Sequence, residues 1–200
     1  MARQLISGAG GLLNHVEMVY RPSERALVGR LFEALGCKVI ETGGRFLVIH
    51  ADPQAADPRM LDNCLYASEV TPEQWRFEEA LQRELGSRRE LLESYRALAA
   101  MTRRKPQHTT HFGIRLSSLA RLEEILTSLE SLRDEEPLWR RRVEISGVFR
   151  PGDAESLSDT LVQAFVRTDV CAAGFVSLGQ HIELQAVTDI YLDSSGNSAR

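Results

Sequence analysis

The chain has 200 residues, of which 43% are hydrophobic and 26% are charged, as in an ordinary globular protein. Its formal net charge of −4 argues against a dedicated nucleic-acid-binding protein, because such proteins usually carry a large basic excess. Its apolar runs all fall short of the roughly 18 residues that a membrane-spanning helix needs, so we expect no contact with a membrane.

The three cysteines are odd in number and far apart in the sequence. Cys37, Cys64 and Cys171 show neither the spacing of a zinc site nor that of a redox pair, so we expect reduced, mostly buried thiols in a cytoplasmic protein. Residues 1–11 contain no sustained apolar segment, which argues against a signal peptide. We expect residues 1–11 to form a flexible lead-in and residues 191–200 a flexible tail.

Residues 12–70 are predicted to contain a strand, a helix and three further strands. The strand over 13–20 is followed by a helix with helically spaced apolar residues, with Ser23 as its expected N-cap and Gly36 ending it. Two Asp-Pro pairs indicate a loop over 51–62. Alternating or β-branched runs then predict the remaining strands of this half, at 37–42, 45–50 and 63–70.

Residues 108–190 are predicted to repeat that order. A strand at 111–116 precedes an apolar stripe from Leu119 to Leu129 that is typical of a helix. Three further strands are expected at 142–149, 161–170 and 175–187.

The segment 71–107 between the halves is predicted to be helical. Thr71 is the expected N-cap, Pro72 suits the first helical position, and Gly86 indicates a break or kink. One face of this segment is apolar. It either packs on its own domain or forms a contact in a homodimer, and the sequence leaves both interpretations open.

Histidine and glutamate recur at corresponding places in the two halves. The first strands begin at His15 and His111, and the last strands end near Glu69 and Glu183. Two imidazoles and two carboxylates in repeated positions suit a divalent cation. A single strand histidine, however, is more often structural than a ligand.

Four further side chains are expected beside these residues, because residues two apart on a strand point to the same face. They are candidates for substrate binding: Glu17, Arg115, His181 and Gln185. The alternative for two of them is a buried ion pair between Glu17 and Arg115.

Three stretches resemble the vicinal oxygen chelate superfamily, which includes glyoxalase I, extradiol ring-cleaving dioxygenases, and bleomycin- and fosfomycin-resistance proteins. They are His15-Val-Glu-Met-Val-Tyr-Arg-Pro-Ser-Glu, then Leu31-Phe-Glu-Ala-Leu-Gly-Cys, and finally His181-Ile-Glu-Leu. With their duplicated order, the resemblance covers about residues 12–70 and 108–188. It implies an α+β fold of two βαβββ units that form a half-open curved mixed sheet around a cleft.

The resemblance also implies a metal site in that cleft. The glyoxalase I pattern corresponds to His15, Glu69, His111 and Glu183, with Glu69 and Glu183 as catalytic candidates. The dioxygenase pattern omits Glu69. Both imply a divalent ion (Fe, Ni, Mn, Co or Zn) and a metal-dependent lyase, isomerase or ring-cleaving dioxygenase that acts on a small molecule with vicinal oxygens.

Two alternatives remain within the same resemblance. A metal-free protein could bind a small molecule in the cleft, as resistance proteins of this superfamily do. A catalytically silent scaffold could instead fill the cleft with its own side chains.

Overall fold

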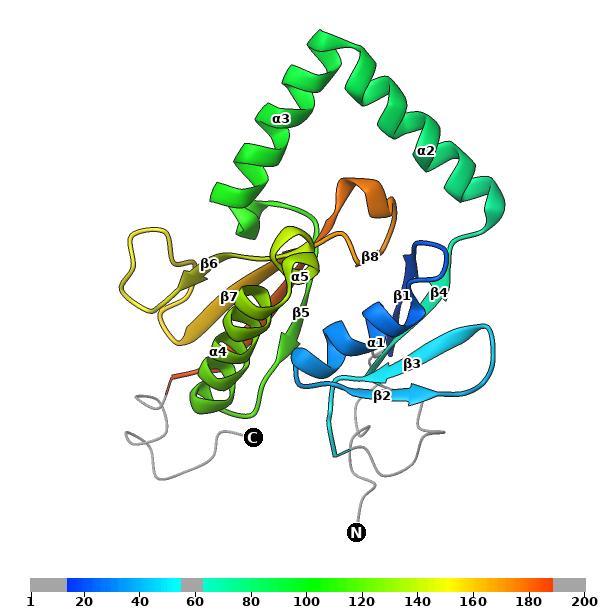
Figure 1. The fold of residues 1–200 in the computed structure, drawn as a ribbon. Coiled ribbons are helices and arrows are strands. Elements are labelled where there is room, and N and C mark those ends of the chain that lie inside the picture. The colour runs from blue at the N-terminus through cyan, green and yellow to red at the C-terminus, as the bar shows by residue number, and fades with distance from the viewer. Residues whose placement is uncertain (1–13, 55–62, 189–200) are drawn as a thin grey trace, which may run out of the picture.

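The structure is a computed structural model, and it describes residues 14–54 and 63–188 (Figure 1). These residues form a mixed α+β fold with one sheet of five strands and one of four. The lead-in and tail expected at 1–11 and 191–200 lie outside the described residues, as does most of the predicted loop at 51–62.

The first sheet is built mainly from the N-terminal half. Its elements are β1 (His15–Tyr20), α1 (Arg25–Ala34), β2 (Lys38–Glu41), β3 (Phe46–His50) and β4 (Cys64–Glu69). The strand order is β2-β3-β4-β1, and β1 runs parallel to β4. A short strand from the second half, β8 (Cys171–Ala172), completes the sheet beside β1.

The second sheet comes from the C-terminal half. Its elements are β5 (His111–Arg115), α4 (Leu119–Glu135), α5 (Pro137–Arg142), β6 (Val143–Phe149), β7 (Leu161–Thr168) and β9 (Gln180–Val187). The strand order is β5-β9-β7-β6, and β5 runs parallel to β9. The expected strand over 175–187 is wrong in its first part, because a 3-10 turn (Val176–Leu178) ends at Gly179 with φ of 78°.

Two helices, α2 (Pro72–Ser87) and α3 (Arg89–Arg104), form a hairpin that projects from the rest of the molecule (Figure 1). The cap predicted for α2 is confirmed, since the Thr71 side chain accepts a hydrogen bond from the Gln74 amide and Pro72 stands in the first turn. A 3-10 turn (Pro106–His108) then leads into β5. Within the described residues, no helix is long and apolar enough to cross a bilayer.

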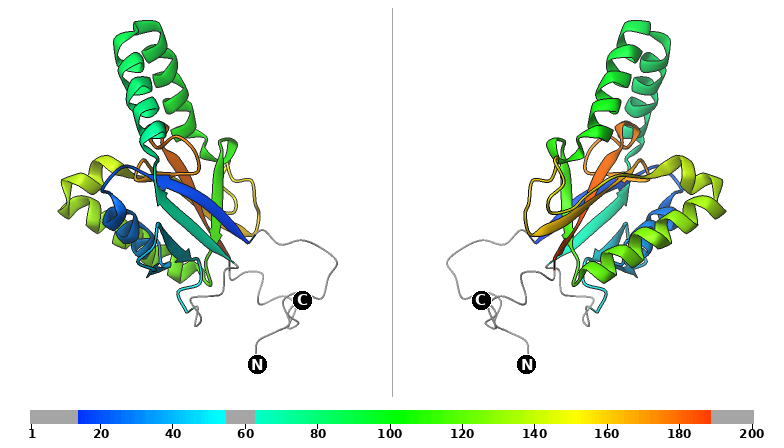
Figure 2. Two further views of the ribbon diagram at one scale, coloured as in Figure 1. Left: turned by 90° about the vertical axis from the view of Figure 1, so that its right-hand side faces the viewer. Right: turned by 90° about the vertical axis from the view of Figure 1, so that its left-hand side faces the viewer.

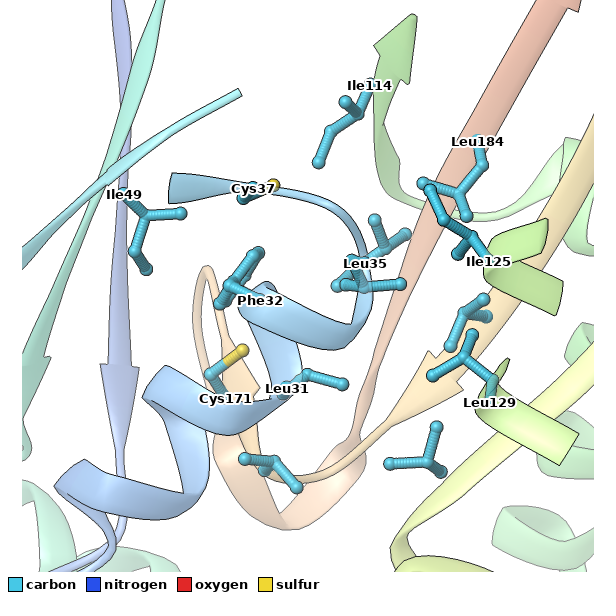
Figure 3. Close-up of a cluster of buried hydrophobic side chains, with 14 of the residues drawn as sticks. Leu31, Phe32, Leu35, Cys37, Ile49, Ile114, Ile125, Leu129, Cys171 and Leu184 are labelled. Carbon is cyan, nitrogen blue, oxygen red and sulfur yellow. The ribbon is translucent and has the colours of Figure 1, made fainter. Parts of the chain in front are cut away.

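Helices α1, α4 and α5 lie on one side of the two sheets, and the opposite side carries no helical layer (Figure 2). One continuous core joins both halves. Leu31 and Phe32 of α1 and Leu129 of α4 are fully buried in it (Figure 3). Each such side chain contributes roughly 1.5–3 kcal/mol through the loss of its apolar surface from water.

The C-terminal end of α1 was predicted correctly, whereas its N-cap was not. Gly36 ends the helix as expected, with φ of 82°, and a Cβ there would stand 2.9 Å from Ile125 of α4. Glycine therefore permits the close approach of α1 and α4. At the other end Ser23 is not the N-cap; it takes φ of 65° in the preceding turn, and Glu24 occupies the cap position.

Within the described residues, none of the three cysteines forms a disulfide, and all three are buried, as predicted. Burial raises the pKa values of the Cys37 and Cys171 thiols to about 12, so both stay protonated at neutral pH.

Candidate functional site

Strand register decides which predicted site residues share a face. In the parallel pair of β5 and β9, His111 lies opposite His181 and Gly113 opposite Glu183. Ile114 and Leu184 alternate with them and belong to the core on the helical side. His111, His181 and Glu183 therefore belong to the face of the second sheet that the helical layer leaves uncovered (Figure 2).

The hydrogen bonding of His111 fixes which of its ring nitrogens carries a lone pair that can bind a ligand or a cation. Nδ1 lies 2.7 Å from the carbonyl oxygen of Thr109, and because a carbonyl only accepts, Nδ1 must carry the proton. The remaining Nε2 lies 3.3 Å from Oε2 of Glu183. The two residues form an ion pair if the ring is protonated. If the ring is neutral, two lone-pair atoms converge as two ligands of one cation do.

Glu183 is held from several directions. Its side chain is only 5% exposed, and Oε1 accepts a hydrogen bond from the Gln163 amide of β7. Gly113 stands opposite it, where a Cβ would come within 3.1 Å of Oε2. Phe165 packs edge-on against His111, with ring centroids 5.3 Å apart. Such outer contacts are what orients a ligating carboxylate and imidazole in a metal site.

His181 is the second residue of β9; it lies on the same face but is deeply buried. Its Nδ1 lies 3.5 Å from the Thr109 hydroxyl oxygen, and its buried Nε2 has no hydrogen-bond partner among the described residues. Burial, helped by the positive charge of Arg167, lowers the pKa of His181 to about 4. The ring is therefore neutral at physiological pH and does not act as a cation toward a ligand.

The first sheet places a different residue beside its histidine. Nδ1 of His15 lies 2.7 Å from the Asn14 side-chain oxygen, and the His15 ring lies 5.2 Å from that of Tyr66. In the register of β1 and β4, Tyr66 stands relative to His15 where Glu183 stands relative to His111. Burial, together with Cys64 and Glu17, raises the pKa of Tyr66 to about 12, so the phenol remains protonated.

Glu69 is not brought to His15. Cys64 is the register partner of His15, and Glu69 lies five positions further along β4, opposite Tyr20. An odd offset reverses the face, so Glu69 points to the side of α1. There its carboxylate accepts a hydrogen bond of 2.9 Å from the Ser23 amide. The structure thus gives the expected fourth ligand a role in the turn before α1.

The remaining predicted side chains lie along the same strands. Arg115 donates to the Gln185 side chain at 3.3 Å, instead of pairing with Glu17 as the alternative interpretation required. Glu17 is exposed and accepts a long hydrogen bond of 3.5 Å from the Ser68 hydroxyl.

The residues fit a cation only in part. Within 14–54 and 63–188, no group of three histidine, cysteine or acidic side chains is arranged to hold a metal ion. His111 and Glu183 fit as a pair of ligands. The four-ligand set does not fit, because Glu69 faces the helices.

Sequence reasoning missed two residues of this site. Gln163 and Phe165 support Glu183 and His111 from β7. The alternation of the predicted strand at 161–170 could have placed them on one face, but only the pairing of β7 with β9 identifies that face.

Comparison of the chain with protein-family models, with curated proteins and with solved structures finds no match.

Proposed function

We propose that the chain is a protein of the vicinal oxygen chelate type, with two βαβββ units side by side. Each half runs as a strand, a helix and then further strands, and the first strand of each half pairs in parallel with a later one. The helices α1 and α4 cover one side of both sheets, which leaves the other side for a ligand (Figure 2).

The proposed activity is a metal-dependent reaction of a small oxygenated molecule on the uncovered face of the second sheet. The observation that carries this proposal is the pair His111 and Glu183. The His111 Nδ1 proton is engaged by a backbone carbonyl, and Nε2 lies 3.3 Å from the carboxylate. A divalent ion here (Fe, Ni, Mn, Co or Zn) would polarise a substrate oxygen as a Lewis acid.

The contacts of Glu69 favour a two-histidine, one-carboxylate set over the four-ligand set. Its carboxylate is engaged at Ser23, on the side of α1. His15 would be the third ligand once a cation is bound, because its Nδ1 donates to the Asn14 side-chain oxygen and leaves the Nε2 lone pair for the cation; the described residues do not by themselves bring three such ligands together. Such sets leave open positions for two oxygens of a substrate.

Metal content tests the proposal. The protein is purified without chelator, and bound transition metals are measured for wild type, His111→Ala, Glu183→Gln and the matched control Glu69→Gln. We expect about one ion per chain in wild type and in the control, and loss of the ion in the other two variants. Metal retained in His111→Ala, or lost equally in Glu69→Gln, contradicts the assigned ligands.

A metal-free binding protein is the second candidate. It is favoured by the 3.3 Å separation of His111 and Glu183, which also suits a closed imidazolium–carboxylate ion pair. In that case titration with Fe(II), Ni(II), Mn(II) and Zn(II) shows no binding to a folded wild-type protein. The fully buried ring of Phe165 on this face favours the related interpretation in which the protein's own side chains fill part of the cleft.

A further inference from the structure

A groove of about 670 Å³ lies between the end of α3 and strand β6. Its walls include three consecutive basic residues, Arg103, Arg104 and Lys105, and its floor includes Gly147 and Phe149. The segment 71–107, which the sequence left without an assigned role, therefore reaches the second sheet and forms one side of a hollow there.

An ion pair fastens this end of α3 to the sheet. Nε of Arg103 lies 2.9 Å from Oε2 of Glu144 in β6, and both side chains are partly buried. Arg103 is consequently engaged and positions the helix, and its charge is balanced by Glu144.

The next two basic residues take no part in this ion pair. Arg104 and Lys105 are exposed, and within the described part of the chain neither forms an ion pair with an acidic side chain. Glu155 is the acidic residue among those that line the groove. The groove therefore presents more positive than negative charge, although the whole chain carries −4.

The floor of the groove is aromatic. Phe149 packs edge-on against Phe165, with ring centroids 5.8 Å apart, and Phe165 packs in the same way against His111. A Cβ on Gly147 would stand 2.9 Å from the Phe149 ring, so the glycine leaves room for that ring over β6. With strands about 4.8 Å apart, β6 and β5 are separated by roughly 14 Å on this face.

We propose that this groove binds the anionic group of an organic ligand, a carboxylate, sulfonate or phosphate, through Arg104 and Lys105. The apolar or aromatic body of the ligand rests against Phe149. Guanidinium and ammonium groups bind such oxyanions through charge-assisted hydrogen bonds. The inference goes beyond the proposed function, because binding in the groove requires neither His111 nor a metal ion.

Paired probes test the groove. The full chain is titrated with 2-naphthoate and with the neutral 2-naphthalenemethanol, and binding is followed by naphthalene fluorescence. We expect naphthoate to bind about ten-fold more tightly, as a hydrogen bond to a charged group would give. Arg104→Ala/Lys105→Ala should remove that advantage, and inorganic phosphate should compete with naphthoate.

A second double variant supplies the control. Arg88→Ala/Arg89→Ala makes the same change in charge at the other end of α3, where both arginines are exposed. It should keep the preference for naphthoate, and circular dichroism confirms that each variant is folded. Equal affinity for the two probes, or equal weakening in both double variants, overturns the proposal, because the attraction would then be non-specific.

The outcome is separable from that of the metal experiment. His111→Ala is expected to lose metal and to bind naphthoate within about two-fold of wild type, since His111 lies about three strand spacings away. A chain without metal that still prefers naphthoate refutes the metal site alone. If the chain binds metal but does not prefer naphthoate over the neutral probe, only the groove proposal is refuted.

Discussion

His181 is a histidine whose surroundings oppose its protonation. It is 5% exposed, and burial together with the nearby Arg167 lowers its pKa from 6.5 to about 4. In the unfolded chain the ring returns to its ordinary pKa. The unfolded state therefore takes up a proton at a higher pH than the folded state does.

This difference predicts a loss of stability in mild acid. The contribution of His181 is fully present above pH 6.5 and is lost as the pH falls toward 4, since only the unfolded state is protonated in that window. A difference of about 2.5 pKa units corresponds to roughly 3 kcal/mol. Urea denaturation at several pH values should show wild type losing about that much more free energy of unfolding than His181→Asn.

The asparagine can keep a donor toward Thr109 and does not titrate, which makes it a suitable comparison. Parallel pH profiles for the two proteins would show that His181 keeps its ordinary pKa in the folded state.

At the residue scale, the sequence could nominate His111 and Glu183 for one site because histidine and glutamate recur at corresponding places in the two halves and match the resemblance. It could not place Glu69, since the face of a residue depends on where its strand begins to pair. Glu69 is the last residue of β4, which is the position that the sequence assigned to the site. The pairing register of β1 and β4 instead places Tyr66 on the same face as His15, two residues beyond its partner Cys64. A shift of one residue moves a side chain to the opposite face.

Helix α3 has an unusual environment for an element of sixteen residues. None of its residues is buried, and Leu91 and Leu98 are 41% and 56% exposed. Its contacts are mainly with α2, with the 3-10 turn at Pro106–His108 and with β6, to which Arg103 is ion-paired through Glu144. A helix of about this length is marginal in water without tertiary packing.

We therefore expect α3 to open far more readily than the centre of the second sheet. Amide hydrogen exchange should be orders of magnitude faster in α3 than in β7, where Ala164, Phe165 and Val166 are fully buried. Comparable protection in α3 and β7 at low protein concentration would contradict this expectation. Protection of α3 that rises with concentration would instead support the homodimer contact considered from the sequence.

At the scale of elements, regular periodicity made most helices and strands predictable. The break near Gly86 appears as the boundary between α2 and α3. Helix α5 was missed because its six residues, four of them Trp or Arg, lack a helical stripe. Strand β8 was missed because two residues carry no period, and its place depends on a pairing with β1.

An ion cluster joins the two halves of the molecule. Arg142, at the end of α5, donates to both carboxylate oxygens of Glu24 at 2.9 Å and also to Asp169. Arg21 pairs with Asp169 at 2.7 Å. Burial alone would lower the pKa of Arg142, but the hydrogen bonds to Glu24 and Asp169 outweigh it and raise the pKa.

Removing Arg142 from this cluster should lower the free energy of unfolding more than removing a surface arginine does. The Arg142 side chain is 11% exposed, so Arg142→Ala leaves two carboxylates poorly compensated and should lower the free energy of unfolding by about 3 kcal/mol. The control Arg140→Ala removes an exposed neighbour and should cost about 1 kcal/mol or less. Equal losses in urea denaturation would show that the cluster contributes no special stability.

The short strand β8 has a consequence for synthesis on the ribosome. Val19 and Tyr20 of β1 pair with Ala172 and Cys171, which are translated long after them. Until those residues emerge, the nascent first half exposes an open sheet edge, which can pair with another chain. The vulnerable period therefore lasts through translation of the hairpin and most of the second sheet, and co-translational aggregation should fall once Cys171 is available.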